Sequence, residues 1–165
     1  MTDAVNVRPI DDDEREQVTK LLTERWGSTV VVSRGERHDL RALPTIVAEQ
    51  DGEIVGVVTY APGPPDQGSA EITSLDALRP DRGVGTALLD AVIDVALSNG
   101  WRRLWLVTTN DNTHALRFYQ RRGWDLVAVH RDAVDDARAT KPEIPERGND
   151  DIAIRHELEL ELVLQ

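Results

Sequence analysis

A short turn with two glycines opens the most regular helical pattern of the chain, and this combination restricts the fold more than any other feature. The turn is Arg82-Gly83-Val84-Gly85-Thr86, and Asn99-Gly100 supplies a left-handed helix end. Leu104 to Val107 is then a continuous apolar run, as in a central strand that is covered on both faces. Together with a strand expected at Glu71 to Leu78, this order predicts a right-handed crossover between two parallel strands. The helix itself is indicated by apolar residues at helical spacing, namely Leu88, Ala91, Val92, Val95 and Ala96.

The remaining apolar patterns predict further strands and helices. Asp51-Gly52 is a strong hairpin turn because both positions tolerate positive φ. Glu157 to Leu162 alternates strictly, which predicts a terminal antiparallel strand with one buried and one wet face. Val30 to Val32 forms either a strand or a loop on the substrate side. The expected strands cover residues 5–9, 45–49, 54–60, 71–78, 104–107, 126–129 and 157–162, and the expected helices cover residues 11–26, with Val18, Leu21, Leu22 and Trp26 on one face, 84–98, 112–122 and 132–140.

Length and composition exclude several classes of protein. At 165 residues the chain is expected to form a single domain over residues 1–165. Because it has no cysteine, disulfides, thiolate metal sites and a thiol acyl-enzyme are excluded. The four histidines show no metal-ligand spacing, so we expect no metal site. No signal peptide and no apolar stretch of membrane-spanning length is evident, which predicts a cytoplasmic protein without membrane association.

The charge is strongly acidic but unevenly distributed. A net charge of -11 argues against binding to nucleic acids or anionic membranes, which depends on long-range attraction. Residues 79–122 nevertheless contain seven Arg and four Asp, a local charge of +3. A basic island in an acidic protein suits a small polyanionic ligand, although a chance distribution of surface charge is the alternative.

A glycine turn that leads from a strand into a helix is suited to bind an anion, because its unpaired N–H groups point outward and glycine allows close approach. Gly83, Val84, Gly85 and Thr86 are the candidate donors. The alternative is an ordinary tight turn. A Walker loop lacks support because no Lys-Ser/Thr pair follows, and Leu88 stands at the third glycine position of a dinucleotide fingerprint. An enzyme that uses S-adenosylmethionine or a dinucleotide is therefore a weaker alternative, since Thr108-Thr109-Asn110 is a poor match for its ribose-binding acid.

A second motif follows 27 residues after Gly85: Asn112-x-x-Ala115-x-x-Phe118-Tyr119-x-x-x-Gly123-Trp124. Together the two motifs resemble the GNAT N-acetyltransferase superfamily over about residues 45–131, and residues 104–112 resemble a bacterial subgroup. The resemblance implies an α/β (α+β) fold: a mixed, mostly antiparallel sheet of six to seven strands, a central splayed parallel pair, and about four helices. It implies an enzyme that transfers acetyl from acetyl-coenzyme A to a primary amine by direct attack.

The resemblance also implies roles for particular residues. Asp76, Ala77 and Leu78 would contact the acetyl-pantetheine through their main chain, with the Leu78 N–H facing the thioester carbonyl. The family pattern has Gln or Arg where this chain has Pro80, so one phosphate contact must be absent or come from elsewhere. The coenzyme-binding residues expected in addition are Arg79 or Arg82 as substitutes for that contact, Gly83, Val84, Gly85 and Thr86 in the turn, and Asn112, Ala115 and Phe118 on the second-motif helix.

Two residues are expected to move protons. Tyr119 is the candidate acid for the leaving thiolate, and Glu71 is the candidate base for the incoming ammonium. The alternatives are a tyrosine that packs beside Phe118 and a solvated edge carboxylate. For the whole chain, the alternative is a non-catalytic acyl-coenzyme A sensor of the same fold. The acceptor is expected to be a small-molecule amine or a peptide amine, and pairing through the final strand would give a homodimer.

Overall fold

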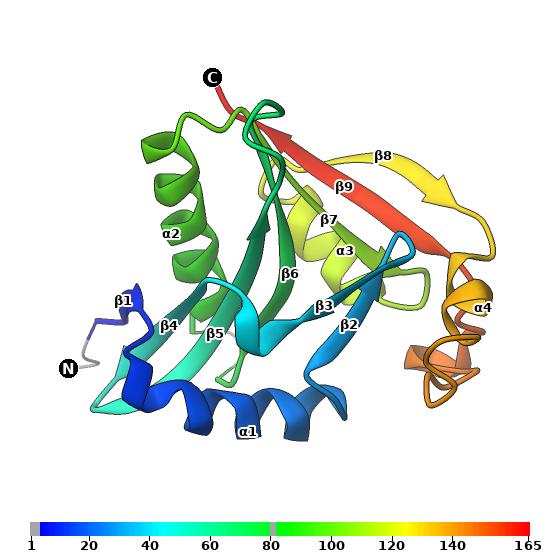
Figure 1. The fold of residues 1–165 in the computed structure, drawn as a ribbon, viewed down its shortest axis with the longest axis horizontal. Helices are drawn as coiled ribbons and strands as arrows, with labels where there is room; N and C mark the ends of the chain where they lie inside the picture. Colours follow the sequence, from blue (N-terminus) through cyan, green and yellow to red (C-terminus); the bar gives the residue numbers. More distant parts are fainter. Residues whose placement is uncertain (1–3, 80–81) are drawn as a thin grey trace. The chain divides into compact units, whose positions relative to one another are not determined.

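The structure is a computed structural model that describes residues 4–79 and 82–165 (Figure 1). Within these ranges the α-helices are α1 (Arg15–Trp26), α2 (Val84–Ser98), α3 (Thr113–Gln120) and α4 (Ala133–Ala137), with short 3₁₀ turns η1 (Asp12–Glu14), η2 (Leu40–Ala42) and η3 (Asn149–Asp151). The strands are β1 (Asn6–Pro9), β2 (Val30–Ser33), β3 (Glu36–Asp39), β4 (Thr45–Gln50), β5 (Glu53–Pro62), β6 (Ser69–Ala77), β7 (Arg103–Thr109), β8 (Asp125–His130) and β9 (Glu157–Val163).

Seven strands form one mostly antiparallel sheet with a parallel pair, in the order β1-β4-β5-β6-β7-β9-β8, and β2 and β3 form a separate hairpin. The expected α/β fold class, its strands and its four helices are therefore confirmed. The chain divides into two compact units. The first unit comprises the described residues of Met1–Val31, Asp39–Leu104 and Leu164–Gln165, and the second comprises Val32–His38 and Trp105–Val163.

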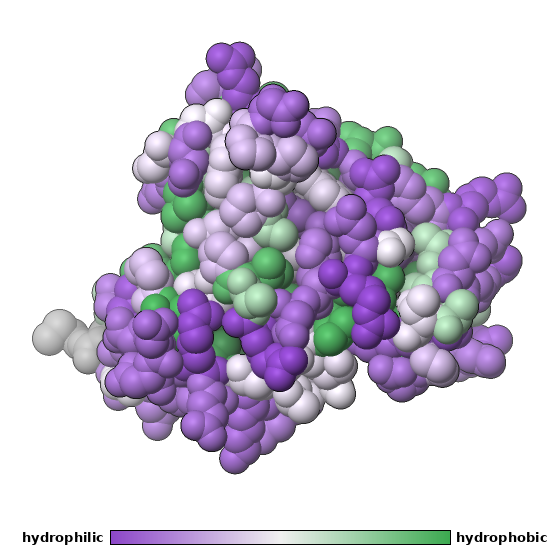
Figure 2. All heavy atoms as spheres, in the orientation of Figure 1, coloured by the Kyte–Doolittle hydropathy of each residue, from purple (hydrophilic) through white to green (hydrophobic). Residues whose placement is uncertain are grey.

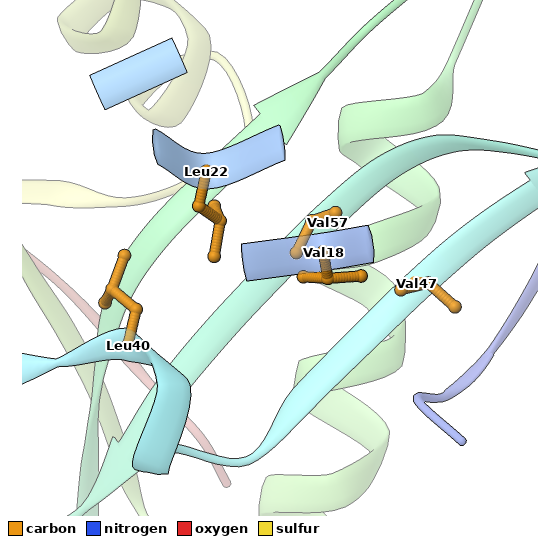
Figure 3. Packing of buried hydrophobic residues seen from close by; sticks show 5 residues of the cluster. All are labelled: Val18, Leu22, Leu40, Val47 and Val57. Carbon is orange, nitrogen blue, oxygen red and sulfur yellow. The ribbon is translucent and has the colours of Figure 1, made fainter. Parts of the chain in front are cut away.

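In the first unit, α1 covers one face of β4 and β5. Its residues Val18 and Leu22 are buried in one cluster with Leu40, Val47 and Val57, and Figure 3 shows these five side chains. The helix ends at Gly27, whose φ of 75° gives the left-handed end that the sequence predicts. Burial of this apolar face, and not intrinsic helix propensity, provides most of the stability of a helix of this length.

Trp26 does not belong to this core, contrary to the sequence interpretation. Its side chain is 45% exposed, and its indole Nε1 donates to a carboxylate oxygen of Asp76 on β6 at 2.5 Å. The Nε of Arg25 lies 3.5 Å from the other oxygen of Asp76. The last turn of α1 is thus fastened to β6 through polar contacts, because the apolar stripe of the helix ends before Trp26.

The N-terminal strand is held by one arginine. The Arg8 guanidinium donates to both carboxylate oxygens of Glu14, at 2.6 and 2.9 Å, and to Glu49 on β4 at 2.7 Å. The hydrogen bonds that Glu14 accepts from Arg8 and from the Asp11 N–H lower the pKa of Glu14 to about 2. Arg8 therefore ties β1 to both η1 and β4.

The opposite face of the first-unit strands packs against α2. A Cβ at Gly56 of β5 would lie 2.5 Å from Val84 Cγ1 and 2.9 Å from Leu88 Cδ1, so only glycine permits this approach. Gly56 and Val57 are consecutive in β5 and point to opposite faces, which places α2 and α1 on opposite sides of the strands. The start of α2 is positioned by this contact.

In the second unit, β8 and β9 pair antiparallel, as expected for the final strand. The prediction of one wet face on β9 is wrong, because Glu157, Glu159 and Leu160 are buried. Glu157 accepts a hydrogen bond from the Arg34 N–H at 2.9 Å. Glu159 lies 3.3 Å from the Arg34 guanidinium and 3.0 Å from Nε2 of His130. Charged partners allow these glutamates to be buried at positions that the alternation predicts to face solvent.

Arg34 lies at the tip of the β2–β3 hairpin, which settles the alternative left open for residues 30–32 in favour of a strand. Arg34 and Gly35 both have positive φ, as a two-residue hairpin turn requires. The strand order also bears on the expected homodimer. Since β9 lies between β7 and β8, its edges are not available for pairing with a second copy, and β8 is the end strand.

The polar run at the end of β7 anchors the segment before β9. Asn110 Oδ1 accepts from the N–H groups of Arg155 and His156, at 2.9 and 3.0 Å. Asp111 is buried and accepts from Asn149 through its N–H and its side-chain amide, at 3.0 and 3.1 Å. The expected two-sided cover of β7 is only partly confirmed, since Leu104 and Leu106 are buried but Trp105 is half-buried.

Hydrophilic residues dominate the face shown in Figure 2, in keeping with a chain in which 30% of residues are charged. Among the helices of the described residues, none is long and apolar enough to cross a membrane.

Candidate active site

The glycine turn begins α2 as predicted. Gly83 is the residue before the helix and has a φ of 74°, a left-handed conformation that favours glycine. Its carbonyl accepts the N–H of Ala87 at 3.0 Å, the first hydrogen bond of the helix. The amides of the preceding turn have no carbonyl one turn earlier within the helix and lie at the positive end of its dipole. Val84 and Gly85 are buried, whereas Gly83 is exposed.

The two arginines that could replace the missing phosphate contact differ in their surroundings. Pro80 lies outside the described residues. Arg79 donates to Glu53 at 2.9 Å and to Gln50 at 3.3 Å, so its guanidinium already has partners on β4 and β5. Arg82 is exposed next to the turn. Of the two substitutes, Arg82 is therefore the better placed to meet an anion.

The main chain at the end of β6 departs from the role expected for Leu78. The N–H of Leu78 donates to the Val55 carbonyl at 2.8 Å, so it points toward β5 and its expected role as the donor to a thioester carbonyl is wrong. In an antiparallel pair, successive residues direct their amides to alternate edges. The amide of Ala77, which is paired with Gly56, therefore points away from β5.

The carboxylates of β6 are both enclosed. Glu71 is only 4% exposed, so the alternative of a solvated edge carboxylate is wrong. Asp76 is buried and bound by Trp26 and Arg25. The register with β5 places both side chains on the α1 face of the strands, because Glu71 pairs with Ala61 and Asp76 with Val57. Catalytic bases are commonly carboxylates that are shielded from solvent in this way.

The second-motif helix is α3, in the second unit. Asn112 is its N-cap and accepts the N–H of Ala115 at 3.1 Å, as predicted. Tyr119 is 7% exposed and packs edge-on against Phe118, with ring centroids 5.1 Å apart, and against Trp124, at 5.3 Å. The structure thus shows the packing of Tyr119 beside Phe118 that the sequence analysis gave as the alternative. It leaves the role of the Tyr119 hydroxyl as a prediction, because the aromatic contacts involve the ring.

Phe118 is also covered by a cation. The Arg122 guanidinium lies 3.7 Å from its ring centroid and donates to its carbonyl at 2.9 Å. The predicted site residues fall into two groups. The first unit holds Glu71, Asp76, Ala77, Leu78, Arg79, Arg82, Gly83, Val84, Gly85 and Thr86, and the second holds Asn112, Ala115, Phe118 and Tyr119.

The sequence interpretation missed a cluster of hydroxyl groups beside Glu71. Thr59 on β5 and Thr73 and Ser74 on β6 are joined by hydrogen bonds. No local pattern marks these residues, because threonine and serine are common in half-buried strands. Only the pairing of β5 with β6 brings them together.

Comparison with known proteins identifies the family. The model of the acetyltransferase (GNAT) family matches residues 10–124, and the chain belongs to this family. Two proteins of Bacillus subtilis (strain 168) are similar along almost all of it. YdhI is 36% identical over 151 residues, which is 91% of this chain and 92% of YdhI. YxbD is 35% identical over 162 residues, which is 98% of this chain and 100% of YxbD.

Solved structures share the fold at lower identity. An IAA acetyltransferase from Bacillus cereus ATCC 14579 has a TM-score of 0.73 at 22% identity, with 98% of this chain and 100% of that chain covered. A GNAT family acetyltransferase from Elizabethkingia anophelis with acetyl-CoA bound has a TM-score of 0.71 at 17% identity, with 98% and 99% covered. These similarities support the fold independently of the motifs.

Proposed function

We propose that this protein is a single-domain enzyme that transfers an acetyl group from acetyl-coenzyme A to a primary amine. The observation that carries the proposal is the turn at the start of α2, where Gly83 has a left-handed φ directly before the first amides of a helix, in a member of the acetyltransferase family. The E. anophelis relative in fold carries acetyl-CoA, which supports the same co-substrate here. We also propose a cytoplasmic location.

For the coenzyme, we propose contacts in each unit by itself. Its pyrophosphate would accept from the amides of Val84, Gly85 and Thr86, with Arg82 as a charged partner. The pantetheine arm would contact residues of β6 and of α3 with its N-cap, namely Asp76, Ala77, Asn112, Ala115 and Phe118. Because the Leu78 amide is bound to Val55, the Ala77 amide is the better donor for the thioester oxygen.

Glu71 and Tyr119 move the protons of the proposed reaction. Glu71 accepts a proton from the incoming ammonium, directly or through water, and so frees the nitrogen lone pair. The nitrogen then forms a bond to the acetyl carbon and the carbon–sulfur bond breaks. Tyr119 donates its hydroxyl proton to the departing sulfur, and the second proton of the nitrogen passes through water to the Tyr119 phenolate, so that the products are the neutral acetylated amine and coenzyme A as a thiol.

The acceptor is proposed only as a class. The net charge of -11 favours a cationic amine over an anionic one, since an acidic protein attracts cations at long range. This argument includes small polyamine-like molecules and basic peptide termini. Thiol release measured with a panel of both kinds would identify the class.

The test of the mechanism is Tyr119→Phe. Loss of a general acid is expected to lower turnover by about 10²-fold or more, while the ring packing against Phe118 and Trp124 and the binding of acetyl-coenzyme A are retained. Tyr60→Phe is the matched control, because Tyr60 also packs edge-on against an aromatic ring, that of Trp101. Turnover of Tyr119→Phe equal to that of the control would remove Tyr119 from the mechanism.

Binding and release together separate an enzyme from a sensor. A rise in melting temperature with acetyl-coenzyme A shows binding to the folded state. If this rise occurs and no amine in the panel releases thiol, the protein is a sensor of the same fold. If S-adenosylmethionine raises the melting temperature instead, the proposed function fails.

A further inference from the structure

Strand β6 is irregular at one position. Thr59 of β5 pairs with Ser74, and the next residue, Tyr60, pairs with Ile72, so Thr73 is an extra residue in β6. This is a β-bulge, in which two residues of one strand lie opposite one residue of the other. On either side of Thr73 the register is regular, from Gly56 opposite Ala77 to Pro62 opposite Ala70.

The bulge decides which face of the strand carries Glu71. Glu71 and Asp76 are five residues apart, and in a regular strand they would point to opposite faces. In this register they are paired with Ala61 and Val57, which lie on the same face of β5. That face carries the α1 core, while the other face carries Gly56 against α2. Without the bulge, Glu71 would turn toward the α2 face.

Three hydroxyl groups hold the bulge. Oγ1 of Thr59 lies 2.7 Å from Oγ1 of Thr73 and 2.6 Å from Oγ of Ser74. Thr59 is fully buried, with 0% exposure, and Ser74 is buried as well. The Thr59 side chain of β5 is thus hydrogen-bonded to both residues of the bulge, Thr73 and Ser74. Loss of the Thr59 hydroxyl would remove this contact from both β6 hydroxyls, that of the half-buried Thr73 and that of the buried Ser74.

We propose that Thr59 is a positioning residue for Glu71: its hydroxyl fixes the bulge that turns the Glu71 carboxylate onto the α1 face of β6. This inference rests on the proposed function, in which Glu71 receives the proton of the amine. In this proposal Thr59 affects the reaction only through Glu71, and it contacts neither substrate nor coenzyme. A base must lie within hydrogen-bond reach of its proton, so a change of face removes it from the reaction.

The test compares Thr59→Val, which keeps the shape but lacks the hydroxyl, with Thr59→Ser, which keeps the hydroxyl. Thr59→Val is expected to lower kcat by about 10-fold to 100-fold, as for misplaced catalytic groups, with little change in acetyl-coenzyme A binding. Thr59→Ser is expected to restore most of the rate. Equal loss in both variants would mean that the methyl group acts through packing, and would overturn the inference.

A double variant separates this role from general destabilisation. If Thr59 acts through Glu71, Thr59→Val adds little to the loss caused by Glu71→Gln, whereas independent effects multiply. Multiplied losses would overturn the inference. Should Glu71→Gln alone leave turnover unchanged, the proposed base is wrong, a result distinct from a failure of Thr59.

Two further measurements keep the inference testable if Thr59→Val does not fold or no acceptor has been found. Thr73→Val removes a hydroxyl of the same cluster at a half-buried position and is expected to give the same loss of kcat. The ¹³C signal of the Glu71 carboxyl, followed against pH, reports its surroundings without an acceptor. An unchanged titration of Glu71 in both Thr59→Val and Thr73→Val, or in Thr73→Val alone where only that variant folds, would overturn the inference.

Discussion

At the scale of single residues, Gly56 shows how an absent side chain sets the position of a helix. The Val84 methyl group that would collide with a Cβ at Gly56 belongs to the first turn of α2, the turn that also contains the proposed phosphate donors. Packing in the interior is dense, so an added methyl group must displace its neighbours. The contact therefore links the stability of the first unit to the geometry of the anion site.

Gly56→Ala is expected to destabilise the protein by about 1–3 kcal/mol, the usual cost of overpacking, and to weaken acetyl-coenzyme A binding as the start of α2 shifts. Urea unfolding and a thermal-shift titration would measure the two effects. In Gly56→Ala/Val84→Ala the colliding methyl group is absent, so the double variant should lose less than the sum of the single variants. A simple sum would show that the Val84 contact is not the cause.

Glu157 shows the opposite situation, a charged group that is buried where the alternation predicts exposure to solvent. Desolvation raises the pKa of Glu157 above its usual value of about 4.5, although the hydrogen bond from the Arg34 N–H and the charges of His130 and Arg34 oppose this rise. A carboxyl with a raised pKa binds its proton more tightly in the folded state than in the unfolded state. Its contribution to stability therefore increases as the pH falls through the folded pKa and is unfavourable above it.

Glu157→Gln is expected to raise the melting temperature at about pH 7.5, because the buried charge is lost while an amide oxygen can still accept from Arg34. The gain should shrink toward about pH 4.5, where Glu157 itself is protonated. Scanning calorimetry at several pH values checks this, with the exposed Glu146→Gln as control. A gain that does not depend on pH would contradict the electrostatic explanation.

At the scale of elements, the end of β7 shows how one polar run connects three segments. Asn110 binds the residues before β9, Asp111 binds η3, and Asn112 caps α3. Gly148 lies so near Asp111 that a Cβ there would overlap its carboxylate. The residues shared with the bacterial subgroup therefore have a structural explanation in this run, whatever the acceptor is.

Asp111→Ala is expected to release the segment around η3. Loss of hydrogen bonds to a buried carboxylate should cost about 1.5–3 kcal/mol. Trypsin cleavage after the exposed Arg147 should become faster than in the parent protein. Asp125→Ala, which removes an exposed carboxylate from β8, should leave the cleavage rate unchanged. Equal rates for Asp111→Ala and the parent protein would show that other contacts hold the segment.

At the scale of the whole molecule, screening by salt is expected to change stability and coenzyme binding in opposite directions, because the net charge is -11 whereas residues 79–122 are locally positive. Repulsion among like charges weakens the compact state, and salt screens it. The attraction proposed between Arg82 and the coenzyme phosphates is screened as well.

Raising NaCl from about 20 mM to about 200 mM is therefore expected to increase the melting temperature of the free protein and to weaken acetyl-coenzyme A binding. Thermal shift without and with the coenzyme measures both effects. Potassium fluoride in place of NaCl serves as the control for specific ion binding. Stability that falls with salt would mean that local ion pairs, such as that of Arg8 with Glu14, outweigh the global repulsion.

The sequence by itself determined the kind and order of the four helices and of the seven strands in the main sheet that the structure describes, because helical spacing, alternation and turn residues act over a few neighbours. The hairpin at Asp51-Gly52, the helix end at Gly27 and the cap at Asn112 were predictable for this reason. The two motifs also predicted the family through Gly83 and Asn112, since both residues occupy local positions at helix starts. The sequence did not predict β3 (Glu36–Asp39), whose residues show no apolar alternation.

Only the tertiary structure decided which way particular groups point. The bulge at Thr73 turns Glu71, the bond to Val55 turns the Leu78 amide, and Arg34 allows the β9 glutamates to be buried. Each of these outcomes depends on pairing between segments far apart in the chain. A shift of one residue in a strand reverses the faces of all residues that follow, and no local pattern encodes that shift.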